Sequence, residues 1–377
     1  MTFIYLYMNI NVELIKKQLT YKIDDNQEEV DYNELNAIET DESSKNNTIN
    51  TNNTSSIQVY DFFSINNIQI SEILKKIPFY WLYFHLFIDY TFVKLGEMNA
   101  SYIENYTLIT KNNEKHVLFR YKKEDFISFH YFMTHFPNPK LYIFYIIDSY
   151  SHLLKNLLLL NNNNVCFFNI SYKNIVFNAA FKPILINFDE CLQIDNINKA
   201  EYLSKILDKI DSYTLKPLEA HVLFYLIKNN EQTLSYSSID SICDFFVQNH
   251  PIVPLFSLSY KNQLFQTCCN SLKKYINVPK PAIINEIIQY SYTWDNYSLS
   301  LLYLYFVCNI NKTISLKDCF LTKFYMLLNK NIHPDPKKRE TLQNTIDQFN
   351  ELFETFTDWS FVNGISQENY KKVLHVK

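Results

Sequence analysis

The stretch VCFFNISYKNIVFNAAFKPILINFDECL, Val165–Leu192, decides how the rest of the chain is interpreted. β-Branched and aromatic residues alternate between Asn-rich turns, which predicts a β-hairpin. Its expected strands are Asn174–Phe177 and Pro183–Phe188, joined by the turn Asn178-Ala179-Ala180. One irregular loop precedes the hairpin, and a second follows Asn187-Phe188-Asp189.

Composition predicts a globular protein with appendages. The chain has 377 residues, of which 47% are hydrophobic and 16% aromatic, enough for one large two-lobed domain or two ordinary ones. The net charge is -4 and the sequence pI about 6.2, so no long-range attraction to nucleic acid or anionic membranes is expected. The abundance of Asn gives runs such as Asn161–Asn164 little functional weight, since an AT-rich genome would produce them.

Glycine and cysteine usage excludes several kinds of site. Gly96 and Gly364 are the two glycines, so neither a G-x-G-x-x-G loop nor a Walker A loop is present. The seven cysteines form no C-x-x-C pair, which favours reduced thiols in an intracellular, cytoplasmic protein. The longest apolar runs, Phe79–Ile88 and Tyr297–Ile310, are too short to span a bilayer, so no membrane association is expected.

The loop-hairpin-loop layout resembles the catalytic and metal-binding loops of a eukaryotic-type protein kinase, where H-R-D-x-x-x-x-N precedes a hairpin and D-F-G. Matching the family's Asn to Asn174 puts Asn169 at the catalytic Asp and Ser171 at the catalytic-loop Lys. The D-F-G triplet falls on Asn187, Phe188 and Asp189. The resemblance implies Asn174, Asn187 and Asp189 as cofactor-binding positions, with Asn174 and Asn187 as weak metal ligands.

These replacements remove the charges that phosphoryl transfer uses. An amide at Asn169 cannot accept a proton near neutral pH, so a general-base contribution of roughly 10²–10⁴-fold is absent. Ser171 cannot offset phosphate charge, and Asn187 is a poor Mg²⁺ ligand where a charged oxygen is wanted. Asp189 would supply that charge only if its loop were reshaped. The pattern is typical of a pseudokinase.

Three further motifs resemble structural features of kinases. Lys216-Pro217-Leu218-Glu219 is similar to A-P-E, whose Glu forms a buried ion pair with an Arg late in the large lobe. His333–Arg339, HPDPKKR, offers Arg339 as that partner. The sequence beginning Trp294-Asp295 resembles D-V-W-S-L, which implies that Asp295 bonds to the backbone of the catalytic loop.

The chain from about residue 60 to 370 also resembles divergent kinase-like proteins encoded by large DNA viruses. Shared patterns are F-N-I-S-x-x-N-I-V-F, K-P-L-E-x-H-V-L-F-Y-L and H-P-D-P-x-K-R, in this order. This resemblance implies a serine/threonine-kinase type of protein in a host cytoplasm.

The expected fold is α+β: a kinase-like bilobal fold with a reduced, strand-rich small lobe and a mainly helical large lobe. The expected divisions are a largely disordered acidic and Asn-rich extension at 1–56, a degenerate small lobe at 57–122, a large lobe at 123–356 with a helical insertion at about 220–292, and a tail at 357–377.

In the small lobe we expect a helix at Ile68–Ile77, a buried strand-rich segment at Phe79–Leu95 and a strand at His116–Tyr121. No strand ahead of the helix supplies the lysine that grips ATP, and Lys94 is interpreted as a surface residue ending a strand. The helix residue that would pair with such a lysine falls near Ile70 or Glu72.

In the large lobe, Lys140–Leu160 is predicted as a helix with one apolar stripe, formed by Ile146, Tyr150, Leu153, Leu157 and Leu160. Asp148, His152 and Lys155 are predicted to lie on its solvated face. Further helices are expected at Lys199–Ile210, His221–Lys228, Ile239–Gln248, Gln263–Ile276 and Pro281–Tyr290, from Trp294 onward, and from Ser315.

Three functions stay open at this point. The first is a catalytically impaired kinase-fold scaffold that binds a protein partner, such as a kinase or a host factor, through its large lobe and insertion. The second is an active atypical serine/threonine kinase that uses Asp189 and an unrecognised lysine. The third is a purely structural component. No cofactor is certain, and ATP and Mg²⁺ are the candidates.

Overall fold

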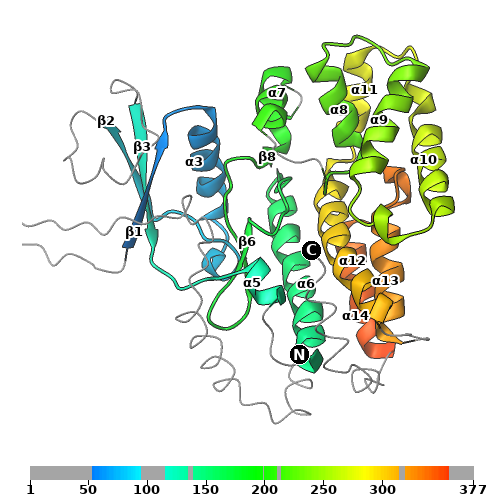
Figure 1. Ribbon diagram of the computed structural model, residues 1–377. Coiled ribbons are helices and arrows are strands. Elements are labelled where there is room, and N and C mark those ends of the chain that lie inside the picture. Colours follow the sequence, from blue (N-terminus) through cyan, green and yellow to red (C-terminus); the bar gives the residue numbers. More distant parts are fainter. Residues whose placement is uncertain are drawn as a thin grey trace, which may run out of the picture. The chain divides into compact units, whose positions relative to one another are not determined.

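The computed structural model describes residues 53–94, 115–134, 139–197, 199–209, 214–313 and 319–355 (Figure 1). The fold is α+β, with many helices and small antiparallel sheets. The chain divides into two compact units, residues 1–58 with 87–125 and residues 59–86 with 126–377. The predicted N-terminal extension up to residue 52, the helix start at Ser315 and the tail at 357–377 lie outside the described residues.

The first unit contains a three-stranded sheet. Its strands are β1 (Asn53–Val59), β2 (Asp89–Lys94) and β3 (Lys115–Lys122), in the order β1-β3-β2. β1 begins ahead of Ile57, where order was expected to resume. β2 and β3 are antiparallel with Asp89 opposite Arg120. The strand expected at His116–Tyr121 is confirmed as β3, and Lys94 ends β2 as an exposed residue.

The prediction that Phe79–Leu95 is buried and strand-rich is wrong in large part. Phe79 is 61% exposed and Trp81 55% exposed, at a 3-10 turn, η1 (Tyr80–Leu82). Phe79 has a positive φ of 57°, which turns the chain where a continuous strand was expected. β2 lies at the edge of its sheet, and Phe92 is also exposed. Aromatic content without a clear period did not distinguish buried from exposed positions.

The second unit begins with helix α3 (Phe62–Leu74). Asp61 caps it, because its side chain accepts hydrogen bonds from the backbone N–H groups of Phe63 (2.9 Å) and Ser64 (3.0 Å). The helix therefore starts earlier than Ile68. Of the two helix positions considered as partners of a phosphate-binding lysine, Ile70 is apolar and fully buried. The other, Glu72, pairs with Lys75 at the end of the same helix (3.0 Å).

The predicted hairpin is confirmed. Strands β4 (Ile127–Ser128), β6 (Ile175–Phe177) and β7 (Pro183–Leu185) form a sheet in the order β4-β6-β7. Ile175 lies opposite Leu185, and Phe177 opposite Pro183. A second small pair, β5 (Val165–Cys166) with β8 (Leu192–Gln193), brings together the two ends of the quoted stretch.

Helices form most of the second unit, and the segments predicted as helical from Lys140 through Trp294 are helical (Figure 1). They are α5 (Phe129–Thr134), α6 (Pro139–Asn162), α7 (Ala200–Lys209), α8 (Leu218–Lys228), α9 (Tyr236–Asn249), α10 (Leu258–Leu272), α11 (Lys280–Ile288), α12 (Trp294–Thr313), α13 (Phe320–Asn331) and α14 (Leu342–Thr355). Short 3-10 turns are η3 (Ile194–Asn196), η4 (Val253–Leu255), η5 (Lys273–Tyr275), η6 (Ser291–Thr293) and η7 (Pro336–Lys338).

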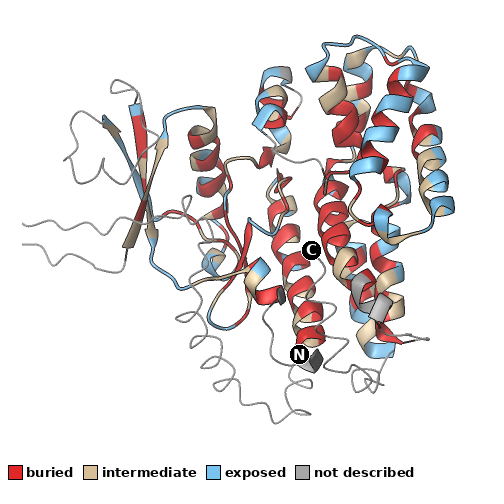
Figure 2. Ribbon diagram, in the orientation of Figure 1, coloured by how far each residue is buried: buried red, intermediate tan, exposed pale blue. Residues whose placement is uncertain are grey.

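Helices α6 and α12 form the centre of this core. α6 packs on α12 and α14, and α12 packs on α13; Figure 2 shows α6 and α12 as largely buried. The five residues of the predicted α6 stripe are each at most 1% exposed. On the other face Lys155 is exposed as expected, but Asp148 is half-buried and pairs with Lys182 Nζ of the hairpin at 2.8 Å.

The predicted insertion corresponds to α8–α11. α8 packs against α9 and α11, and α9 packs against α10. Ser235 and Ser257 cap α9 and α10 by accepting hydrogen bonds from Ser238 N and Tyr260 N. Pro281 lies in the first turn of α11, where its missing N–H leaves no helical bond unmade. Among the described residues, no helix combines the length and apolar character needed to cross a membrane.

Substituting Leu157 tests the importance of the α6 stripe. Leu157→Ala removes a fully buried side chain and should lower the free energy of unfolding by about 2–5 kcal/mol. Lys155→Ala, on the exposed face of the same helix, should change it by less than about 0.5 kcal/mol. Urea denaturation measures both, and equal effects would contradict this packing.

Candidate functional site

The candidate site lies in the loop Phe167–Lys173, between β5 and the hairpin. Asp295, at the start of α12, holds this loop with its carboxylate. The backbone N–H groups of Phe167 and Phe168 donate to its two oxygens, each at 2.7 Å. Asp295 is 3% exposed, and burial raises its pKa, while the two N–H groups act in the opposite direction. The contact agrees with the role expected for Asp295.

Phe168, one of the two residues bonded to Asp295, has a strained backbone; we call these two hydrogen bonds the Asp295 clamp. Phe168 has a φ of 59°, in the left-handed region where a side chain with a Cβ is disfavoured by roughly 1–2 kcal/mol. Its ring is buried against Trp294, with the ring centres 5.5 Å apart. Two charge-assisted hydrogen bonds and this packing offset the backbone strain. The following residue, Asn169, is partly buried.

Three side-chain amides form a hydrogen-bonded chain across the site. Asn187 Nδ2 donates to Asn174 Oδ1 at 2.9 Å, and Asn174 Nδ2 donates to the backbone oxygen of Asn169 at 2.8 Å. Asn169 Nδ2 then donates to Glu190 Oε2. The structure thus brings Asn187, Asn174 and Asn169 together. The last hydrogen bond of the series is to Glu190, a residue that the sequence analysis did not single out.

A buried lysine, Lys216, contacts the same loop. Lys216 Nζ donates to the backbone oxygen of Phe168, lies 3.4 Å from Asn169 Oδ1, and sits 4.6 Å from the centre of the Phe168 ring. Lys216 is 1% exposed, and burial lowers its pKa to about 8, while Glu190 and Asp295 act to raise it. At neutral pH it therefore carries the positive charge that the loop position Ser171 lacks.

Asp189, the proposed source of a metal-binding charge, is engaged elsewhere. Its carboxylate pairs with Lys209 Nζ of α7 at 2.6 Å. Burial acts to lower the pKa of Lys209, but Asp189 and Glu190 outweigh it and raise that pKa. Asn66 of α3 fixes the same loop by donating to the backbone oxygens of Asp189 (2.8 Å) and Cys191 (2.9 Å).

This donor set does not fit Mg²⁺. Asn174 Oδ1 already accepts from Asn187, both groups are neutral, and the neighbouring Asp189 carboxylate is held by Lys209. Mg²⁺ is usually held through one or two carboxylates with near-ideal octahedral geometry. Among the described residues, no group of three or more His, Cys, Asp or Glu side chains is placed to hold a metal ion. Ser171, at the position expected for the catalytic-loop lysine, stabilises the turn of this loop: its backbone oxygen accepts a hydrogen bond from Asn174 N at 3.2 Å.

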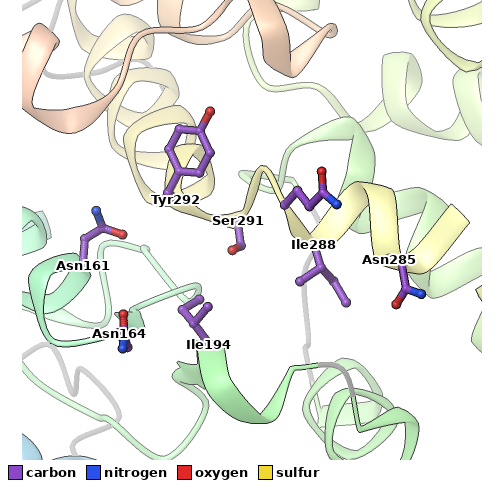
Figure 3. Close-up of a pocket in the computed structure, with 8 residues that line it drawn as sticks. Asn161, Asn164, Ile194, Asn285, Ile288, Ser291 and Tyr292 are labelled. Carbon is purple, nitrogen blue, oxygen red and sulfur yellow. The ribbon is translucent and has the colours of Figure 1, made fainter. Parts of the chain in front are cut away.

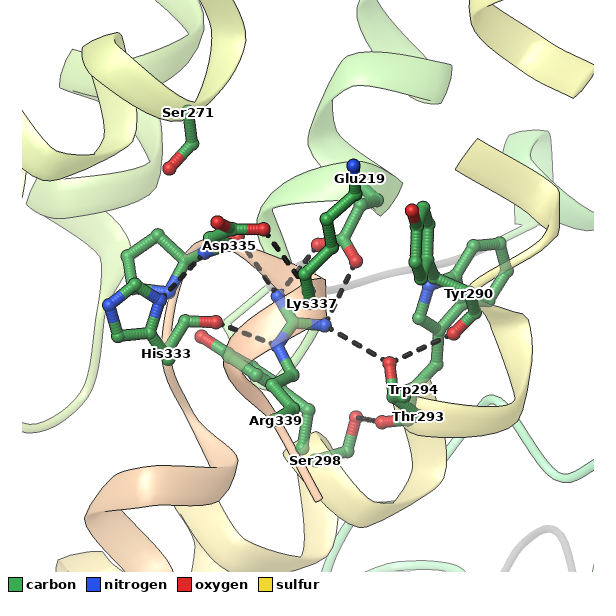
Figure 4. Close-up of polar contacts among 12 residues, drawn as sticks. Glu219, Ser271, Tyr290, Thr293, Trp294, Ser298, His333, Asp335, Lys337 and Arg339 are labelled. Carbon is green, nitrogen blue, oxygen red and sulfur yellow. Dashed lines mark hydrogen bonds and ion pairs between the residues drawn. The ribbon is translucent and has the colours of Figure 1, made fainter. Parts of the chain in front are cut away.

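Glu219 and Arg339 form a separate buried ion pair. Arg339 donates bidentately to the Glu219 carboxylate at 2.9 and 2.8 Å, and the two side chains are 5% exposed or less. Arg339 also donates to the backbone oxygens of His333 (2.7 Å) and Pro334 (3.2 Å) and to the hydroxyl of Thr293 (3.4 Å). Figure 4 shows Arg339 beside His333, Thr293 and Glu219. The pair ties the start of α8 to the turn before α14, as the motif resemblance implied.

The sequence missed Glu190, Lys216 and Asn66. Lys216 and Glu190 both lie within quoted motifs, but nothing in the spacing indicated that they approach Asn169. Asn66 lies far from the site in sequence, on a polar turn of α3.

Comparison with known proteins finds no matching family model and no matching curated protein.

The buried ion pair can be tested against an exposed one. Arg339→Met leaves the Glu219 carboxylate buried without a partner and should lower the free energy of unfolding by about 3–5 kcal/mol. Adding Glu219→Leu should restore part of that loss. Lys274→Met breaks a pair whose side chains are 40% and 39% exposed and should cost about 1 kcal/mol or less. Chemical denaturation that ranks the two pairs equally would contradict the assignment.

The pKa of Lys216 predicts a pH dependence of stability. A free lysine has a pKa of about 10.4, so between pH 8 and that value the unfolded state binds more protons than the folded state. The contribution of Lys216 to stability should therefore rise with pH across this window, by roughly 3 kcal/mol at about 1.4 kcal/mol per pKa unit.

The measurement is the difference in unfolding free energy between the wild type and Lys216→Met from pH 7 to 11. Thiol and phenol titrations common to both proteins largely cancel in this difference. A flat difference across this pH range would contradict the lowered pKa of Lys216.

Proposed function

We propose that this protein is a kinase-like, catalytically impaired binding module that acts as a scaffold or regulator for a protein partner. The observation that carries the proposal is the amide chain from Asn187 through Asn174 to Asn169. In it, each of the three Asn side chains donates a hydrogen bond to another residue of the site. A transfer site would present charged oxygens to metal ions and to the substrate hydroxyl.

The bilobal kinase-like arrangement is part of this proposal. It is supported by the order loop, hairpin, loop, and by the contact of Asp295 with the first loop. The pairing of Glu219 with Arg339 supports it further. These contacts maintain the fold, and none of them needs a nucleotide or a metal ion. We therefore place the role of the protein in its surfaces, with a kinase or a host factor as the kind of partner.

A second candidate is an atypical serine/threonine kinase. Glu190 favours it, because its carboxylate bonds to Asn169, at the position where the resemblance expects a catalytic base. Lys216 adds a cation beside the same amide. In this alternative Glu190 would accept the proton of a substrate hydroxyl, which is a more specific assignment than the Asp189 hypothesis.

A phosphate-transfer assay separates the two candidates. The full chain is incubated with γ-labelled ATP, Mg²⁺ or Mn²⁺, and a mixed Ser/Thr peptide acceptor. We expect no transfer above that of an Asn169→Ala, Asn187→Ala double variant, because the general base and charged metal ligands are missing. Asn262→Ala, an exposed amide on α10, is the matched control.

Transfer that the double variant loses and Asn262→Ala retains would contradict catalytic impairment. If Glu190→Gln also lost it, while the melting temperature stayed within a few degrees of the wild type, the second candidate would be the function.

A further inference from the structure

A pocket opens where α11 and η6 meet the end of α6. Its volume is about 730 Å³. Asn161 and Asn164 line one side and Asn285 the other, with Ser291 between them (Figure 3). The remaining lining residues are Ile194, Ile288, Gln289 and Tyr292. The pocket lies within the second unit and does not include the loop of the candidate site.

The pocket's polar groups are unused by the rest of the described chain. The side-chain amides of Asn161, Asn164, Asn285 and Gln289 make no hydrogen bond to other described residues. Ser291 is 5% exposed, and its hydroxyl likewise has no partner among them. Its Oγ is open to the pocket, where a ligand can bond to it.

The pocket carries no charge. None of the lining residues is acidic or basic, and Ile194 and Ile288 add apolar surface. A phosphorylated or strongly charged ligand would therefore find no ion pair here. Each side-chain amide offers one donor group and one acceptor, which is the same pair that a peptide bond presents. The chemistry fits a ligand rich in amide groups and poor in charge.

The spacing of the amides fits an extended peptide. Asn285 lies on α11 and Gln289, four residues on, is the helical C-cap of α11, which places their Cβ atoms about 5–6 Å from each other. In an extended chain the groups that point to one side repeat every second residue, at about 6.6–6.8 Å. The backbone groups on the other side of such a peptide would face Asn161 and Asn164, which line the opposite wall of the pocket.

We propose that this pocket is a docking site for an extended segment of a partner protein with uncharged side chains. Asn285 and Gln289 hydrogen-bond to the peptide backbone from one side, and Asn161 and Asn164 from the other. Ser291 adds one hydroxyl at the base. The inference rests on the proposed binding function and gives it a location and a ligand class.

The test begins with the full chain immobilised and a library of random hexapeptides displayed on phage. Enriched peptides are synthesised with a fluorescein label, and their affinity is measured by fluorescence anisotropy. The Asn285→Ala, Gln289→Ala double variant should weaken binding about tenfold or more, because it removes two backbone contacts. An Asn262→Ala, Gln266→Ala double variant has the same spacing on the exposed face of α10 and should bind like the wild type.

Backbone recognition is tested on the peptide itself. N-methylation of one central peptide bond removes a donor without changing any side chain, and it should weaken binding about tenfold. The charged variant Asn285→Asp should also favour peptides with a basic residue over the original set.

Equal affinity for the two double variants, no enrichment of peptides, or full tolerance of N-methylation would each overturn the proposal. Enrichment of a neutral saccharide on a glycan array, in place of peptides, would do the same. The outcome is independent of catalysis: if the protein transferred phosphate, the proposed function would fail while loss of peptide binding in Asn285→Ala, Gln289→Ala would still support the pocket.

Discussion

The carboxylate of Asp295 accepts two hydrogen bonds from consecutive N–H groups of a loop that would otherwise leave them buried and unpaired. Asp295 lies in the first turn of α12, and α12 packs on α6 and α13 in the helical core. The two hydrogen bonds therefore fix the loop to that core. The two hydrogen bonds and the packing of the Phe168 ring offset the strain of its left-handed backbone. The loop held in this way accepts hydrogen bonds from Asn174 and from Lys216.

Around the Asp295 contact, amides stand at the positions where the resemblance to kinases leads us to expect carboxylates. Charged groups are not absent from the region: Glu190, Asp189, Lys209 and Lys216 all approach it. Asp189 pairs with Lys209, and Glu190 accepts a hydrogen bond from Asn169. Lys216 bonds to Phe168 and Asn169, so each of these charges has a partner within the protein. Charges paired in this way do not require a metal ion, which supports the proposal of a binding role.

Local patterns predicted the parts of the fold that depend on local physics. Alternation predicted the hairpin, and a three- and four-residue repeat predicted the buried stripe of α6. The long-range contacts of Asp295 and Arg339 were expected only from the resemblance to kinase motifs. Glu190 and Lys216 escaped prediction because their approach to Asn169 depends on how α8 and the second loop pack. The exposure of Phe79 and Trp81 was not predicted, because a run of aromatic residues without a regular repeat does not indicate which of them face the core. The Asn161–Asn164 run was discounted as composition, yet two of its amides line the pocket.

The central claim is that Asn174 and Asn187 bond to each other and hold no cation. The most direct measurement is the melting temperature with ATP at millimolar concentration, with and without Mg²⁺ or Mn²⁺, for the wild type and Asn187→Ala. A ligand at a hundredfold its Kd would add about 2.7 kcal/mol to stability. We expect no metal-dependent rise in either protein. A metal-dependent rise in the wild type that Asn187→Ala loses would contradict it.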